Sequence, residues 1–188
     1  MQAMTNFPSG GTTIPAELYN PAGTPNGGVV VIAYGSDGMN DPWATMIRDY
    51  AIQLSQKGFV ALIPDYFVST GTKSGLALDA IPIHRDTWQT AVADAVAHAK
   101  TLPSVNASRV GLLGFSLGGH LCLRLRATAK VLVEFFAPEL AEFGGLGLTK
   151  SLTLHAQIHH GLADNLVPFH PNADNIDKTP KTEGLFRN

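Results

Sequence analysis

The feature that most constrains this chain is a serine between two glycines, directly after an apolar run and directly before an amphipathic one. Residues 110–119 read Val-Gly-Leu-Leu-Gly-Phe-Ser-Leu-Gly-Gly, and residues 120–126 continue with apolar side chains at helical spacing. The pattern predicts a strand, a sharp turn and a helix, with Ser116 at the turn. Glycine two residues before and two residues after the serine removes side chains that would clash in such a turn.

The same turn supplies part of the chemistry expected of a nucleophilic serine. The Ser116 hydroxyl lies at the start of the predicted helix, and the backbone N–H of Leu117 faces the same space, where it can bind a developing oxyanion. A second N–H is expected from the loop after the apolar run 29–34, from Gly35 or Ser36, and the side chains do not choose between them. The alternative interpretation is a tight turn in which the serine only caps the helix.

Apolar runs of strand length alternate with segments of helical pattern along the chain. The apolar runs cover residues 29–34, 59–64, 110–115, 130–136 and 151–160. Helical patterns begin after Asp41-Pro42, near residue 83, after Ser116 and near residue 171. This order predicts a single α/β domain over residues 1–188, with a mostly parallel, doubly wound sheet flanked by helices on both faces. Residues 12–19 contain Pro15 and are predicted to form an edge strand.

Composition excludes several classes of protein. With 45% apolar and 15% charged residues, the chain is typical of a globular domain. The net charge of −2 and the lack of a basic stripe argue against nucleic acid as a main partner. No apolar run approaches the roughly 18 residues of a membrane span, and the N-terminus lacks the basic and apolar regions of a signal peptide. One cysteine excludes an internal disulfide framework. We therefore expect a soluble, cytoplasmic protein.

Asp164 is the candidate for the acidic member of a catalytic triad. It lies in the loop 161–168, after a predicted strand downstream of Ser116, and the carboxyl ends of parallel strands meet at one edge of the sheet. The position of Asp164 after Ser116 agrees with a triad whose members follow along the chain in the order serine, acid, histidine. Its role would be to hold an imidazole in the correct tautomer and to stabilise the imidazolium. The alternative is an aspartate that only stabilises its loop.

The histidine of such a triad is not evident. It should follow one more strand beyond Asp164, yet the sole histidine after that residue is His170, which lies too close to belong to another strand. His170 is therefore a weak candidate. His120 is expected to pack or cap behind the turn, and the histidines of the run 151–160 do not converge on a metal site.

The residues above resemble the dienelactone hydrolase branch of the α/β-hydrolases. The resemblance runs from about Thr12 to Pro171 and rests on four segments: residues 29–38, 58–67, 111–119 and 160–168. It implies the α/β-hydrolase fold, no metal or organic cofactor, and hydrolysis of small esters or lactones through a covalent acyl-enzyme. Ser116 matches the nucleophile and Asp164 matches the acid.

Three departures from the family's pattern narrow the expectation. Dienelactone hydrolases proper have cysteine where this chain has Ser116, and glutamate in the loop where Gly35 stands. The resemblance also puts the family's histidine in a segment after residue 188. We therefore expect a serine esterase or lactonase whose domain is incomplete at its C-terminus. A further strand would begin at Leu185-Phe186, with most of that strand and a closing helix missing.

The substrate is expected to be a small ester or lactone, in a pocket formed by Tyr34, Tyr66 and Trp88. Two alternatives stay open. One is a catalytically impaired hydrolase that acts as a binding or interaction module, with an exposed sheet edge that favours a homodimer. The other is a thioesterase or acyltransferase of the same fold.

Overall fold

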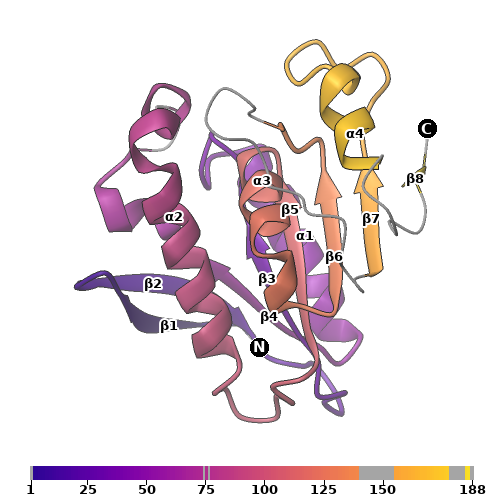
Figure 1. The fold of residues 1–188 in the computed structure, drawn as a ribbon. Coiled ribbons are helices and arrows are strands. Elements are labelled where there is room, and N and C mark those ends of the chain that lie inside the picture. Colours follow the sequence, from indigo (N-terminus) through magenta and orange to yellow (C-terminus); the bar gives the residue numbers. More distant parts are fainter. Residues whose placement is uncertain (1, 74, 76, 140–154, 178–184, 187–188) are drawn as a thin grey trace.

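One sheet organises the part of the chain that the structure describes. The computed structural model describes residues 2–73, 75, 77–139, 155–177 and 185–186, within which eight strands pair in the order β1-β2-β4-β3-β5-β6-β7-β8 (Figure 1). The strands are β1 (Gln2–Ser9), β2 (Thr12–Tyr19), β3 (Val29–Ala33), β4 (Val60–Pro64), β5 (Val110–Phe115), β6 (Val131–Phe135), β7 (His155–His159) and β8 (Leu185–Phe186). Pairing is parallel from β4 to β8, so the predicted doubly wound sheet is confirmed.

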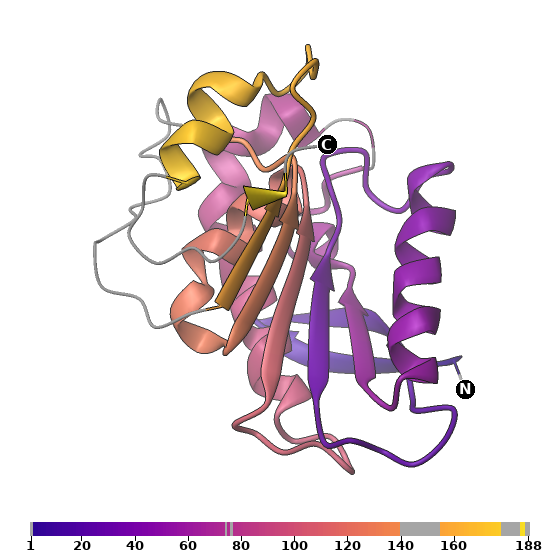
Figure 2. The ribbon, with the colours of Figure 1, turned by 90° about the vertical axis from the view of Figure 1, so that its right-hand side faces the viewer.

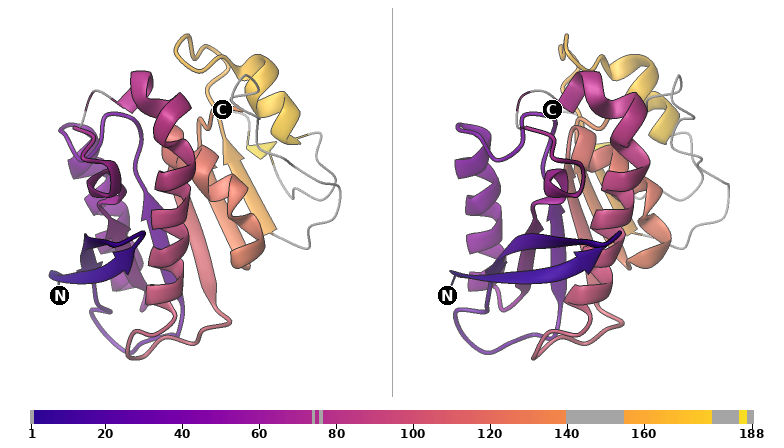
Figure 3. Two further views of the ribbon diagram at one scale, coloured as in Figure 1. Left: turned by 60° about the vertical axis from the view of Figure 1, so that its left-hand side comes forward. Right: turned by 90° about the vertical axis from the view of Figure 1, so that its left-hand side faces the viewer.

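The N-terminal side of the sheet differs from the expectation. Residues 12–19 do form a strand, but β2 is not at the edge, because β1 pairs antiparallel with it on one side and β4 on the other. The β1–β2 turn uses Gly10 and Gly11 at φ 54° and 84°, values that favour glycine. Strand β1 lies beside the helix of residues 77–99 (Figure 3). Phe7 of β1 is buried against the ring of His98 in that helix, which gives this outer strand an apolar anchor.

Helices cover the two faces of the sheet unequally. Helix α1 (Trp43–Gln56) lies on one face, whereas α2 (Ala77–Ala99) and α3 (Leu117–Arg124) lie together on the other (Figure 2). Short 3₁₀ helices cover 66–70 and 126–128, and α4 (Phe169–Asp177) follows β7. Helix α2 begins earlier than expected and continues through Pro82, a residue that in the sequence favours a helix start over a helix interior.

The carboxyl-terminal strands match the prediction where the structure describes them. The predicted strand 151–160 appears as β7, while residues 151–154 and most of the irregular segment 137–150 lie outside the described residues. Residues 185–186, where a further strand is predicted to begin, pair in parallel with Ile158 and His159 of β7. Within the described residues, no helix is long and apolar enough to cross a membrane, and no cluster of three histidine, cysteine or acidic side chains could hold a metal ion.

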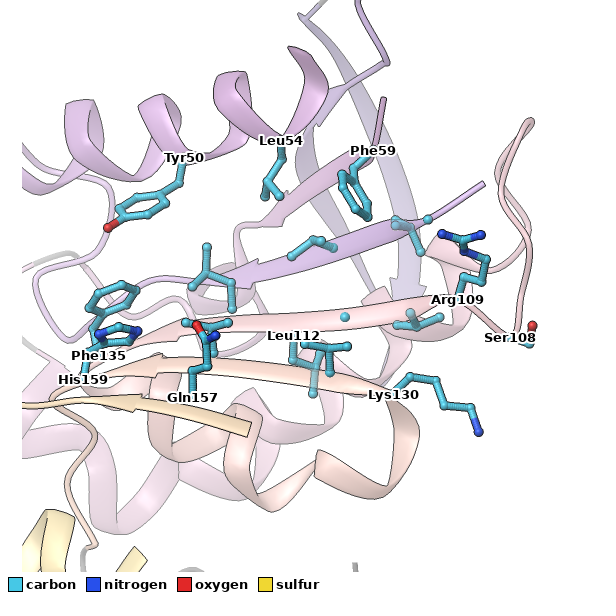
Figure 4. A pocket seen from close by; sticks show the side chains of 18 residues that line it. Tyr50, Leu54, Phe59, Ser108, Arg109, Leu112, Lys130, Phe135, Gln157 and His159 are labelled. Carbon is cyan, nitrogen blue, oxygen red and sulfur yellow. The ribbon is translucent and has the colours of Figure 1, made fainter. Parts of the chain in front are cut away.

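A groove of about 580 Å³ runs over the sheet on the face that carries α1. Figure 4 shows Tyr50 and Leu54 of α1 along one side of it, with the side chains of β5, β6 and β7 forming its floor. Arg109 and Lys130 both lie at one end of the groove, directly before β5 and β6 (Figure 4). The groove leaves Val131 45% exposed, which is unusual for a β-branched residue in a parallel strand.

Candidate active site

The predicted strand, turn and helix around Ser116 are present, and packing explains the glycines. Ser116 joins β5 to α3 with φ 50° and ψ −120°, a strained backbone for a residue with a side chain. A Cβ added to Gly114 would lie 2.5 Å from the carbonyl oxygen of Gly118. A Cβ added to Gly118 would lie 2.1 Å from the carbonyl oxygen of Ala33 in β3. Neither backbone oxygen can move cheaply, so both positions require glycine.

Backbone hydrogen bonds hold the strained serine in place. The Ser116 N–H donates to the carbonyl oxygen of Phe135 at 2.9 Å, and the Ser116 carbonyl accepts from the N–H of His120 at 3.0 Å. The first bond ties the turn to β6 and the second ties it to α3. Ser116 itself remains partly exposed.

Ser116 opens onto a cavity of about 250 Å³ at the carboxyl ends of the strands. Its described lining combines the loop after β3, the start of α1, the ends of β5 and β6, and the loop after β7: Gly35, Ser36, Asp37, Gly38, Trp43, Met46, Ile47, Phe115, Ser116, Phe136, Asp164, Leu166 and Val167. Gly35 lies against the serine, since a Cβ there would be 3.2 Å from Ser116 Cβ and 3.9 Å from its Oγ. The loop expected to supply an oxyanion donor therefore lies beside the hydroxyl.

Asp164 lines the same cavity, as its position after β7 predicts. Its Oδ1 accepts hydrogen bonds from the backbone N–H groups of Leu166 and Val167, both at 2.9 Å, and its own N–H donates to Gly161 at 3.2 Å. These bonds fold the loop around the carboxylate. The structure thus brings Ser116, Gly35, Ser36 and Asp164 to one cavity, although they come from three separate parts of the chain.

No histidine is among the cavity-lining residues in the described part of the chain. His170 is exposed at the start of α4, with its ring edge-on to Phe169 at 4.8 Å between centroids. His160 is buried after β7, where Nε2 donates to the carbonyl oxygen of Val167 at 2.7 Å and Nδ1 has no partner among the described residues. His159 stacks on Phe135 at 4.6 Å in the groove on the opposite side of that strand.

Two buried titratable groups lie behind the turn. His120 packs in α3 as predicted, and its Nδ1 donates to the carbonyl oxygen of Pro138 at 2.9 Å. Burial lowers the pKa of His120 to about 4, so the ring is neutral at pH 7. Glu134 of β6 is fully buried, and burial raises the pKa of its carboxyl group to about 8. One Glu134 oxygen accepts from the N–H of Ala137 at 2.8 Å.

The aromatic residues expected to form the pocket lie elsewhere. Tyr34, Tyr66 and Trp88 are almost fully buried in one cluster and are not among the described residues lining the cavity. Their polar atoms bond within that cluster: Tyr34 Oη donates to Asp65, Tyr66 Oη donates to the carbonyl oxygen of Tyr34, and Trp88 Nε1 donates to Thr70. They brace the loops that follow β3 and β4. The aromatic walls of the cavity are instead Trp43 and Phe136, which the sequence did not indicate, although Phe136 is the last residue of the predicted strand 130–136.

The family can now be stated from a direct comparison. A family model described as the dienelactone hydrolase family matches residues 14–185, which is most of the chain. The chain belongs to the dienelactone hydrolase family. This membership agrees with the resemblance drawn from the motifs, and it makes the protein a member of a family of hydrolases. No curated protein matches the sequence.

Solved structures support the same fold at low sequence identity. A structure titled "m3DLH" has a TM-score of 0.73 at 23% identity and covers 94% of this chain and 75% of that one. A dienelactone hydrolase structure described as putative, from Klebsiella pneumoniae subsp. pneumoniae, has a TM-score of 0.72 at 18% identity, covering 94% of this chain and 77% of that one. An alpha-beta serine hydrolase homologue from Coxiella burnetii has a TM-score of 0.77 at 14% identity, covering 99% and 86%. Since these identities are low, the likeness shows the α/β-hydrolase fold alone.

Proposed function

We propose that the protein is a serine hydrolase that cleaves small carboxylic esters or lactones through an acyl-enzyme on Ser116. The observation that carries the proposal is the shared cavity, onto which Ser116, the loop at Gly35 and Asp164 all open. The strained backbone of Ser116 supports it, because strain of this kind is retained where the fold holds a functional residue in place. The family's hydrolases support the reaction class.

The proposed reaction uses groups of this chain for three tasks. Ser116 Oγ attacks the carbonyl carbon, a new C–O bond forms, and the hydroxyl proton passes to a base that returns it to the leaving alkoxide. The N–H of Leu117 and an N–H of Gly35 or Ser36 stabilise the oxyanion. Water then attacks the acyl-serine, which releases the acid and restores the hydroxyl. No metal or cofactor enters any of these steps. Asp164 orients the base and stabilises its charged form.

In this proposal, the lack of an evident base limits the rate of ester hydrolysis. Because no histidine lines the described cavity, we expect Ser116 to have little more than its intrinsic nucleophilicity in the 188-residue chain. Loss of a triad member costs several powers of ten in rate and leaves the contribution of the oxyanion hole and of binding. His170 stays a weak candidate for the base. Slow ester turnover by this chain is therefore the expected result.

Covalent labelling tests the proposal more directly than turnover does. The wild-type chain, Ser116→Ala and the control Ser108→Ala, which removes a hydroxyl on an exposed loop, are incubated with a fluorophosphonate, and intact mass is measured. Because the oxyanion hole still favours attack by Ser116, we expect one slowly formed adduct in the wild-type and Ser108→Ala chains and none in Ser116→Ala. An adduct that persists in Ser116→Ala would overturn the assignment of the nucleophile. Rapid p-nitrophenyl ester turnover that depends on Ser116 would instead contradict the expected lack of a base.

A second function, as a binding module, is favoured by the groove beside α1. Its walls are mostly apolar, and two cations that form no ion pair with a described residue stand at one end, Arg109 and Lys130. A partner helix antiparallel to the strands would place its negative C-terminal end near these cations. We propose an amphipathic helix with carboxylates near its C-terminus as the occupant.

Matched peptides test this second function. A synthetic amphipathic helix with a leucine stripe and two C-terminal glutamates is compared with the same peptide carrying two lysines there. We expect the glutamate peptide to bind more tightly, and charge reversal in the double variant Arg109→Glu and Lys130→Glu to invert the preference. Equal binding of both peptides would overturn the proposed partner. Self-association of the chain alone in light scattering, abolished by Val131→Glu, would instead identify a second copy as the occupant.

A further inference from the structure

The turn after β6 presents an aromatic wall beside the nucleophile. Phe136 lines the cavity of Ser116, and its ring lies opposite Trp43 of α1 with 6.5 Å between centroids. Phe135, the preceding residue, accepts the hydrogen bond of the Ser116 N–H. The wall is therefore attached to the turn that carries the hydroxyl, and a change in one alters the surroundings of the other.

Phe136 keeps this position in a backbone conformation that bulky residues avoid. Its φ is 45°, in the left-handed region that favours glycine. Among the described residues only Ser104, Ser116 and Phe136 combine a side chain with positive φ, and two of these three line the same cavity. Strain at a bulky residue persists only where the surrounding structure over-determines it.

Four successive residues of the turn, 136–139, are each fixed by a hydrogen bond to a different part of the fold. The partners, in chain order of the turn, are the His159 carbonyl at 2.7 Å, the Glu134 carboxyl oxygen at 2.8 Å, the His120 ring at 2.9 Å and the Asn172 side-chain oxygen at 2.8 Å. Ala137 also packs against α3, since a Cβ on Gly119 would lie 2.8 Å from Ala137 Cβ. The aromatic wall is thus rigid rather than a loop that adapts to its ligand.

We infer that Phe136 is a specificity-determining residue, which together with Trp43 restricts the cavity to small acyl or alkoxy groups. The inference rests on the proposed hydrolase function. The cavity of about 250 Å³ is smaller than most ligand sites, which commonly run from about 300 to 1,000 Å³. Because the wall is rigid, a larger group cannot gain room by displacing it. A substrate with a branched or long chain next to its carbonyl is therefore rejected.

Two matched variants distinguish the effect of the Phe136 ring on cavity size from the effect of its strained backbone. Phe136→Ala and Phe136→Gly both enlarge the cavity, but only glycine relieves the left-handed backbone. Labelling rate constants are measured with a fluorophosphonate that carries a small alkoxy group and with one that carries a bulky group. We expect both variants to shift the ratio of rate constants toward the bulky probe by about tenfold or more. We also expect the melting temperature of Phe136→Gly to exceed that of Phe136→Ala by about 2–4 °C.

Binding of unreactive ketones makes the test independent of catalysis. Trp43 is 41% exposed at the cavity and Trp88, the other tryptophan, is fully buried, so fluorescence quenching by ketones reports on Trp43, with Trp43→Phe as control. We expect wild-type protein to prefer butanone over bulkier ketones and both Phe136 variants to lose this preference. An unchanged preference, or no saturable binding by any of these proteins, would overturn the inference. Absent labelling with intact size-selective ketone binding would overturn the proposed hydrolase alone.

Discussion

The ends of β5 and β7 meet at one cavity but are specified in opposite ways. At the end of β5, the glycines around Ser116 face backbone atoms of β3 and α3 at distances that no side chain could tolerate. At the end of β7, Asp164 is held by N–H groups two and three residues along its own loop. Ser116 is therefore fixed by the packing of the whole sheet, whereas Asp164 is fixed by a local turn. Substitutions at the end of β5 should lower the free energy of unfolding, and substitutions at the end of β7 should lower the reaction rate of Ser116.

The largest expected effect is a loss of stability caused by a substitution at the end of β5. Gly114→Ala places a Cβ 2.5 Å from Gly118 O and from the Cα of Gly119, and we expect the free energy of unfolding to fall by about 3 kcal/mol or more. Gly111→Ala, in the same strand, meets its nearest atom at 3.5 Å and should change it by less than about 1 kcal/mol. Urea unfolding followed by circular dichroism measures both. Equal losses in the two variants would contradict the packing argument.

The second effect separates chemistry from stability at the β7 end. Asp164→Asn keeps an oxygen that can accept the N–H groups of Leu166 and Val167, but it cannot stabilise an imidazolium. We expect the rate of fluorophosphonate labelling at Ser116 to fall by about tenfold or more with little change in melting temperature, because the carboxylate stabilises the charged form of the group that takes the hydroxyl proton. A melting temperature that falls while the labelling rate stays constant would make Asp164 a turn residue only.

The third effect follows from buried titratable groups behind the β5 end. The folded pKa of Glu134, about 8, is above its ordinary value of 4.5, so stability is full below about pH 4.5 and falls as pH rises through 8. The folded pKa of His120, about 4, is below 6.5, so stability falls as pH drops from 6.5 toward 4. The Glu134→Gln variant should remove the loss of stability between pH 4.5 and 8, and His120→Asn should remove the loss of stability between pH 6.5 and 4.

Denaturant unfolding at a series of pH values measures these slopes. Between pH 4.5 and 6.5 the two groups oppose each other, so the stability of wild type should be nearly constant there, while the two single variants should slope in opposite directions. A Glu134→Gln protein that loses stability between pH 6.5 and 8 as steeply as wild type would contradict the assignment to Glu134. The Asp164→Asn variant is the matched control, because a change at the β7 loop should leave both slopes as they are.

The smallest effect tests the surface of the β7 loop. Leu166 lines the cavity but is 82% exposed, and we expect Leu166→Ser to change the free energy of unfolding by less than about 0.5 kcal/mol. Thermal unfolding measures this change. A loss comparable to that of Gly114→Ala would show that the two ends do not differ as described.

The sequence predicted features that depend on local pattern and missed those that depend on packing between distant segments. The apolar runs and the glycines around Ser116 predicted β3, β5, β6 and the turn, because each pattern carries its own steric reason. Residues 2–9 were missed as a strand because their apolar side chains are few, and β1 forms by pairing with β2. Consequently, β2 was expected at the edge.

The residues that form the walls of the cavity could not be predicted from local sequence pattern. Tyr66 was expected at the cavity because its loop converges there, but its side chain turns into the core to bond the carbonyl of Tyr34. Phe136 carries no motif, and its role depends on hydrogen bonds from four elements that meet only in the folded chain. The identity of the base is outside what the spacing of histidines could predict.

The single cysteine makes local opening of the structure behind Ser116 measurable. Cys122 is fully buried in α3 behind the turn, and burial raises the pKa of its thiol to about 12, so a thiol reagent at neutral pH meets neither an accessible sulfur nor a thiolate. Modification must wait until α3 detaches from the sheet. The reaction rate at high reagent concentration therefore equals the rate at which the segment behind Ser116 opens. A destabilising variant at the β5 end should react faster than wild type, because less free energy is then needed to open this segment.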